Sequence, residues 1–177
     1  MVRIALTATL LCILPLPAGA QTIGQPSQPQ YPVHRLAVTA FPELPKNLVA
    51  ELNRRECTIP QPSTDTKENV IRGEFARPGQ TDWALLCSAH GSTSLLVFWN
   101  GKPTNPLVLD KASGSPHGTS DWFIRPVDRK AILDHYRAYG GPKPPPIDHQ
   151  GIESGGEHAS VFLYYYRGKW MTLQGAD

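Results

Sequence analysis

The segment 140–158, GGPKPPPIDHQGIESGGEH, holds the densest group of side chains that could do chemistry. Carboxylates and imidazoles occur in it at short intervals, and these groups bind zinc or transfer protons. Their spacings match no metal-ligand motif, and the glycines between them leave their geometry open. The pattern favours a solvated loop over a zinc or acid–base site for this set: Asp148, His149, Glu153, Glu157 and His158.

The same segment has features of a recognition loop. Three prolines at 144–146 favour a stiff polyproline II conformation. The loop would therefore lose little conformational entropy when a partner binds it. Structureless loops of this length are usually functional or disordered. Ile147 and Ile152 follow no hydrophobic period. We expect Ile147 to dock onto the sheet and the stretch 150–157 to be partly exposed.

Aromatic side chains form a second candidate surface in the last strands of the chain. Alternation along a strand places Tyr165 on the face opposite Tyr164 and Tyr166. One face should belong to the core, and the other could bind sugar or peptide; simple coverage of both sheet faces is the plainer alternative. The two surfaces together give these candidate binding residues: Lys143, Ile147, Asp148, His149, Glu153 and Tyr165.

Motifs of the common catalytic sites are absent from the chain. It has no G-x-S-x-G turn, no H-E-x-x-H pair and no glycine-rich phosphate loop. Ser92 and Ser94 lie beside an expected turn, and His117 and Asp121 lie in a polar loop, where such residues are common. We therefore predict no catalytic residue, no resident metal and no cofactor.

The first twenty residues have the layout of a secretory signal peptide. Arg3 precedes an apolar run from residue 4 to 16, and Ala18-Gly19-Ala20 supplies small residues before Gln21. No other stretch approaches the roughly 20 apolar residues of a membrane-spanning helix. We expect a secreted or periplasmic protein with a signal peptide at 1–20, a flexible Gln/Pro-rich leader at 21–35 and one globular domain at 36–177.

Charge and cysteine content narrow the class further. The whole chain has a formal net charge of +2, and removal of Arg3 with the signal peptide leaves about +1, which gives no reason to expect nucleic acid as a partner. Cleavage also removes Cys12 and leaves Cys57 and Cys87. In an oxidising compartment these two are expected to form one disulfide, with two buried free thiols as the alternative.

The hydrophobic pattern predicts an α+β fold. Helical spacing of Leu48 and Leu52 indicates one short helix over 45–54, on an antiparallel sheet of about five to seven strands. Asn100-Gly101 predicts a type I′ hairpin turn. The residues 131–139 fit a short helix better than a strand. The expected strands, which form a meander and a C-terminal hairpin, cover 69–76, 83–87, 95–99, 107–109, 122–127, 161–166 and 170–173.

Residues 73–85, GEFARPGQTDWAL, resemble the core of a single FG-GAP (integrin-type) repeat. Gly73, Phe75, Gly79, Asp82 and Ala84 match its pattern in register. Alanine, arginine and proline at 76–78 replace the family's calcium-binding positions, so the resemblance implies a strand–turn–strand unit in which Asp82 caps the turn, without calcium. The chain also resembles uncharacterised bacterial exported small proteins, a likeness that implies no activity.

These features favour an exported, non-catalytic binding module for a protein or a cell-envelope component. One alternative is a small secreted hydrolase or metal-dependent enzyme that uses the 140–158 loop. Another is an inhibitor of a secreted enzyme, with the proline-rich run presented as a wedge.

Overall fold

The computed structural model describes residues 33–113, 121–156 and 158–175. The expected signal peptide and leader up to residue 32 lie outside this part. The described chain has two α-helices, α1 (Lys46–Arg54) and α2 (Arg129–Tyr139), and two short 3₁₀ helices, η1 (Val38–Ala40) and η2 (Trp99–Gly101). Its ten strands are β1 (His34–Ala37), β2 (Thr58–Gln61), β3 (Val70–Gly73), β4 (Asp82–Ala89), β5 (Ser92–Phe98), β6 (Leu107–Ser113), β7 (Phe123–Val127), β8 (Gly151–Gly155), β9 (Ser160–Tyr166) and β10 (Lys169–Gln174).

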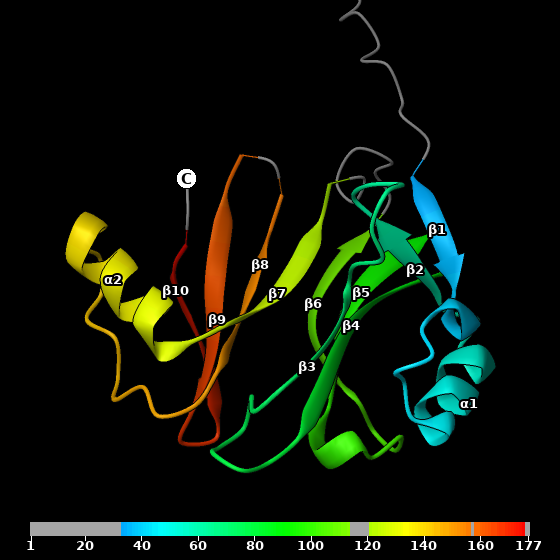
Figure 1. Ribbon diagram of the computed structural model, residues 1–177, viewed down its shortest axis with the longest axis horizontal. Helices are drawn as coiled ribbons and strands as arrows, with labels where there is room; N and C mark the ends of the chain where they lie inside the picture. Colours follow the sequence, from blue (N-terminus) through cyan, green and yellow to red (C-terminus); the bar gives the residue numbers. More distant parts are fainter. Residues whose placement is uncertain (1–32, 114–120, 157, 176–177) are drawn as a thin grey trace, which may run out of the picture.

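The strands form two antiparallel sheets. Sheet A has the order β1-β2-β4-β5-β6, and β3 also pairs with β4. Sheet B has the order β10-β9-β8-β7. Figure 1 shows four layers that follow one another from left to right: α2, sheet B, sheet A and α1.

Three apolar clusters fill the spaces between these layers. The first joins α1 to sheet A around Leu48, Leu52 and Phe98. The second joins the two sheets, with Phe75 and Leu86 from the sheet A side and Ile152 from sheet B. A third lies between sheet B and α2. Sheet A is therefore apolar on both faces, which explains why Asp82–Ser88 is buried without alternation.

Helix α1 and the disulfide form where the sequence predicts them. Leu48 and Leu52 are fully buried, and on the polar side Glu51 accepts hydrogen bonds from Arg54 and Arg55. The Arg54 and Arg55 hydrogen bonds lower the pKa of Glu51 to about 2. Beyond the helix, Cys57 and Cys87 form a disulfide across 30 positions, as predicted. It fastens the end of α1 to a central strand of sheet A.

Both halves of the chain repeat the same order of elements. β1–α1–β2–β4–β5 and β7–α2–β8–β9–β10 each run strand, helix, strand, strand, strand, with successive strands as antiparallel neighbours. In both halves the last two strands meet at a two-residue turn with positive φ: His90-Gly91 and Arg167-Gly168. β3 and β6 are the strands of sheet A that lie outside this repeat.

The architecture differs from the sequence prediction in three respects. The ten described strands form two sheets rather than one sheet of five to seven, whereas the short helix predicted over 131–139 is confirmed as α2. Asn100 and Gly101 have the predicted positive φ but lie in η2, and the connection to β6 continues to residue 106. Pro103 and Pro106 have no N–H to donate to the backbone hydrogen bonds between β5 and β6. This explains why β6 begins only at Leu107 and not directly after the predicted turn. β1 begins at His34, inside the segment assigned to the leader.

The prediction that 150–157 is irregular and partly exposed is also partly wrong. Its first residues form β8, which lies between β7 and β9. Ile152 is fully buried between the sheets, and Gly151 is buried against the Leu163 carbonyl. A side chain at 151 would sit 2.8 Å from that oxygen, so the glycine serves close strand packing rather than loop freedom.

Asn69 connects the two sheets through its buried amide. Its Nδ2 donates to the Pro60 and Trp122 carbonyls, both at 2.8 Å, and its Oδ1 accepts from the Ile124 N–H at 2.9 Å. Its own carbonyl accepts from the Leu86 N–H. With φ of +68°, asparagine is one of the few residues that adopt this backbone readily.

We predict that Asn69→Ala lowers the free energy of unfolding by about 3 kcal/mol more than Asn105→Ala. Both residues have positive φ, so both variants carry the same backbone strain, but Asn105 is exposed. The difference therefore reports the three lost side-chain hydrogen bonds. Urea unfolding measures it, and equal losses for the two variants would contradict the role given to Asn69.

Candidate functional site

The structure separates the predicted binding residues into two places. Lys143 is exposed on the segment that leads from α2 to β8. Ile147 is 6% exposed and packs in the cluster under α2, which confirms the predicted docking. Glu153 lies in β8, where its Oε1 accepts from the Ser160 hydroxyl. Tyr165 lies on the opposite face of sheet B from the other candidates. Glu157 and His117 are outside the described residues.

Asp148, His149 and Tyr164 form one hydrogen-bonded group, which we call the Asp–His–Tyr group. His149 Nδ1 lies 2.6 Å from Asp148 Oδ1 and 3.0 Å from the Tyr164 hydroxyl oxygen. The Tyr164 hydroxyl accepts a hydrogen bond from the Asp148 N–H and donates one to Asp148 Oδ1, both at 3.1 Å. The imidazole and the phenol ring stack with centroids 4.5 Å apart.

The environment of this group sets its charges. The His149 hydrogen bond lowers the pKa of the Asp148 carboxyl, and burial raises the pKa of the Tyr164 phenol. Because the pKa of Asp148 is lower in the folded state, its bonds stabilise the fold at neutral pH. That contribution is lost as the pH falls below the ordinary aspartate value towards the lowered one.

The Asp–His–Tyr group has the elements of a proton relay but mainly fastens the chain. The His149 side chain is 5% exposed, and its Nε2 is buried with no partner among the described residues. Asp148, at 69% exposed, is the only member that faces solvent broadly. Among the described residues, no three His, Cys, Asp or Glu side chains are placed to hold a metal. The hydrogen bonds hold residues 146–149 against β9.

Trp99, Tyr165 and Trp170 form the second group, which we call the aromatic cluster. Trp99 comes from η2 beside sheet A, and the other two come from the β9–β10 hairpin of sheet B. The rings of Trp99 and Trp170 stack with centroids 5.8 Å apart and an interplanar angle of 16°. The Tyr165 ring centroid lies 5.0 Å from that of Trp99 and 5.5 Å from that of Trp170. All three side chains are half-buried, so the cluster closes one end of the space between the sheets and still meets solvent.

Asp82 holds the loop beside this cluster. Its fully buried carboxylate accepts from the Phe75 and Ala76 N–H groups through Oδ2, and from the Gln80 amide and the Asn100 N–H through Oδ1. All four donor–acceptor distances are between 2.7 and 3.0 Å. Asp82 therefore caps the turn after β3 and also fixes that turn to η2.

An open pocket of about 390 Å³ lies between that turn and η2. Figure 1 shows the β3–β4 turn, η2 and the β9–β10 turn at the same end of the molecule, at the bottom of the view. The pocket adjoins the aromatic cluster through η2, where Asn100 follows Trp99 directly. Its lining residues are Arg77, Pro78, Gly79, Gln80 and Asn100.

At this end of the molecule the sequence singles out Tyr165 as a candidate binding residue and places Trp170 in the last strand. The hydrophobic pattern puts Trp99 at the end of a strand, and Asn100 is recognisable only as a turn signal. Arg77 and Gln80 lie in a turn whose sequence suggests loss of a calcium site and nothing more. A signal was present in the resemblance, which implied that Asp82 caps the turn, but spacing alone does not reveal what the turn faces.

Asp82→Asn should lower the free energy of unfolding by about 2–3 kcal/mol. The asparagine amide has the shape of the carboxylate. Its NH2 group, however, replaces one acceptor oxygen and faces N–H groups that need an acceptor. Amide hydrogen exchange should also speed up at Phe75, Ala76 and Asn100. Asp65→Asn, on an exposed aspartate, is the matched control and should change stability by less than about 0.5 kcal/mol. Unchanged exchange at all three amides would refute the bracing role of Asp82.

For the Asp–His–Tyr group, Tyr164→Phe should cost about 1–2 kcal/mol and make residues 142–150 more sensitive to limited proteolysis. The substitution removes only the hydroxyl that these residues bond. Tyr166→Phe is its control, since that half-buried phenol donates no hydrogen bond to a described residue. If the two variants resist protease equally, the group does not fasten the segment.

No protein-family model, no curated protein and no solved structure matches this chain. Neither α-helix of the described part is long and apolar enough to cross a membrane. Of the two groups of side chains above, the aromatic cluster adjoins the open pocket through η2, where Asn100 lines the pocket.

Proposed function

We propose that this protein is an exported, non-catalytic binding module for a cell-envelope component, and that it binds its ligand at the aromatic cluster. The observation that carries this proposal is the half-buried group of Trp99, Tyr165 and Trp170 at the end of the molecule where Asn100, the residue after Trp99, lines an open pocket. Large rings with one apolar face in contact with solvent are the usual anchors of recognition surfaces.

The framework around the cluster supports a preorganised site. Asp82 fixes η2 to the β3–β4 turn, and the Gln150 side chain and backbone each bond the Glu74 backbone across the two sheets, at 3.0 and 3.1 Å. Ligand binding to such a surface orders little new chain. Rigid sites lose less free energy on association than mobile loops do.

The alternatives from the sequence have less support in the geometry. The hydrolase or metal-enzyme hypothesis depends on the 140–158 segment, where the Asp–His–Tyr group is bonded within itself and covered on the imidazole side. The inhibitor hypothesis needs a protruding proline-rich wedge. Pro144 and Pro145 are half-buried and Ile147 is buried, so this run lies against the fold.

Export is the second part of the proposal. The signal-peptide pattern at residues 1–20 predicts it, and the Cys57–Cys87 disulfide is compatible with an oxidising, extracellular compartment. An envelope component is the ligand class that an exported binding module meets there.

Trp170→Ala should reduce co-sedimentation of the purified protein with insoluble cell-envelope material at least tenfold, because it removes one ring of the stacked pair. Trp170→Phe, which restores an aromatic face, should recover part of the binding. Tyr139→Ala is the control: Tyr139 is 71% exposed on α2, away from the cluster, and should bind as the unsubstituted protein does.

Thermal unfolding of each variant separates lost binding from lost folding. A folded Trp170→Ala protein that sediments with the envelope as well as the unsubstituted protein would reject the aromatic cluster as the site. The same rejection follows if Tyr139→Ala loses as much binding as Trp170→Ala.

A further inference from the structure

We infer that the ligand at the aromatic cluster is an acidic saccharide, meaning a sugar chain that carries carboxylates on its rings. This inference rests on the proposed function and names the ligand class for the same site. It follows from two features at this end of the molecule: the aromatic cluster and, joined to it through η2, a pocket lined by one arginine and by amide side chains.

The aromatic cluster suits the apolar face of a sugar ring. Trp99 and Trp170 are nearly parallel, and Tyr165 lies against both. The face of an aromatic ring carries partial negative charge. The axial C–H groups on one side of a pyranose carry partial positive charge and form a flat apolar surface, so the two surfaces attract each other and exclude water.

The pocket offers hydrogen-bonding groups for the hydroxyl rim of the same sugar. Gln80 and Asn100 present amides, which both donate and accept, as sugar hydroxyls do. The Gln80 Nε2 already donates to Asp82, and this bond holds the amide in place while its oxygen remains available to a ligand hydroxyl.

Arg77 gives the pocket its charge. It is exposed, lines the pocket, and forms no ion pair with any carboxylate of the described residues. The carboxylate that braces this turn, Asp82, is fully buried and already accepts four hydrogen bonds from this turn and η2. An unpaired guanidinium with its fork of N–H donors matches a carboxylate bidentately. A saccharide with a ring carboxylate satisfies both the guanidinium and the aromatic faces.

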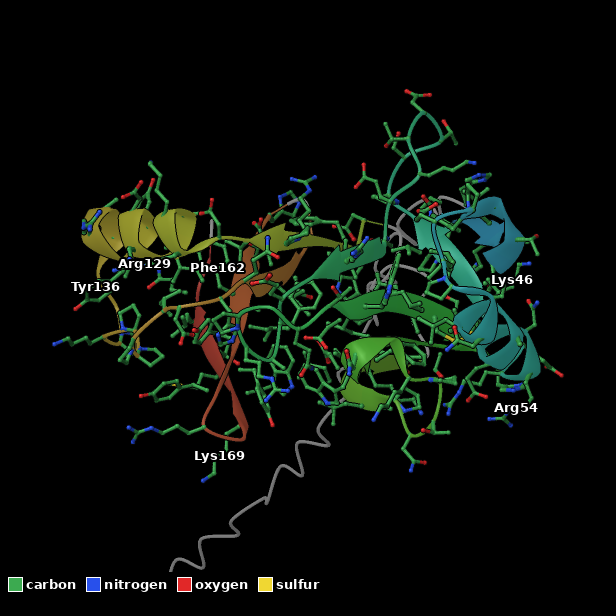
Figure 2. All side chains as sticks on the ribbon, turned by 60° about the horizontal axis from the view of Figure 1, so that its bottom comes forward. Lys46, Arg54, Arg129, Tyr136, Phe162 and Lys169 are labelled. Carbon is green, nitrogen blue, oxygen red and sulfur yellow. A yellow bond between two sulfur atoms is a disulfide. The ribbon has the colours of Figure 1, made fainter. Side chains whose placement is uncertain are left out.

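Arg77 is the one cationic residue among those that line the pocket. Figure 2 shows Arg129 on α2, at the left end of the view, and Lys169 at the tip of the β9–β10 hairpin. Arg129 is also exposed and does not line the pocket, and it therefore serves as the matched control.

The test is isothermal titration of the full mature chain with a galacturonic acid oligomer and with its fully methyl-esterified form. The two probes share ring, linkage and length, and differ only in the carboxylate charge. We expect the free acid to bind at least tenfold more tightly than the ester. Arg77→Gln should remove this preference, Arg129→Gln should leave it unchanged, and Trp170→Ala should weaken binding of both probes.

Each other outcome overturns the inference in a recognisable way. Equal affinity for acid and ester, or a preference that survives in Arg77→Gln, rejects the carboxylate pairing. Tighter binding of a single-stranded oligonucleotide of equal charge, dependent on Arg77, would assign the site to another class of polymer. If neither oligomer binds while Trp170-dependent envelope binding persists, the saccharide inference fails and the proposed function stands; if both are absent, both fail.

Discussion

The Asp82 carboxylate accepts hydrogen bonds from the β3–β4 turn and from η2, and the candidate site depends on this arrangement. The turn has little regular structure, and the N–H groups of Phe75 and Ala76 have no strand partner. Leaving such groups unpaired inside a protein costs about 1–3 kcal/mol each. One buried carboxylate satisfies both groups and reaches across to Asn100, so it determines where Arg77, Gln80 and Trp99 lie.

The second constraint is the attachment of the sheets to each other. Asn69 bonds backbone groups of β2 and of the residues that begin β7, and Gln150 bonds the backbone of Glu74. These links lie along the border where β3 and β7 approach. Apolar packing alone permits sheets to slide, whereas directional hydrogen bonds select one alignment. Trp99 from one sheet therefore meets Tyr165 and Trp170 from the other at a defined separation.

The sequence carried much of the local structure. Periodicity of two located the core of β4, β5, β9 and β10, helical spacing located α1 and α2, and the compartment argument paired Cys57 with Cys87 correctly. Alternation also placed Tyr165 opposite Tyr164. These features depend on near neighbours in the chain or on a single pairing choice, which local patterns can report.

The division into two sheets was beyond such patterns. β4 and β5 are apolar on both faces, a pattern shared by the centre of one large sheet and by a strand between two layers. In the sequence, Gly151 resembles a loop residue, because glycine is common in loops. In the fold it is buried in β8, where only a residue without a side chain fits against the Leu163 carbonyl. The partners of Asn69 and Asp82 depend on contacts between residues up to 55 positions apart.

The central claim is that the end of the molecule with the aromatic cluster meets the ligand. The chain has four tryptophans, Trp83, Trp99, Trp122 and Trp170, whose indole N–H signals are resolvable in a ¹⁵N-correlated NMR spectrum. Trp83 and Trp122 are buried. The indole N–H of Trp122 donates to Ser154 in β8, so the Trp122 signal serves as the internal reference, whereas Trp83 lies beside Gly101 of η2. Titration with solubilised envelope polysaccharide should shift the Trp99 and Trp170 signals and leave the Trp122 signal in place. Saturating ligand that leaves Trp99 and Trp170 unmoved, with shifts confined to residues 142–150, would contradict the account.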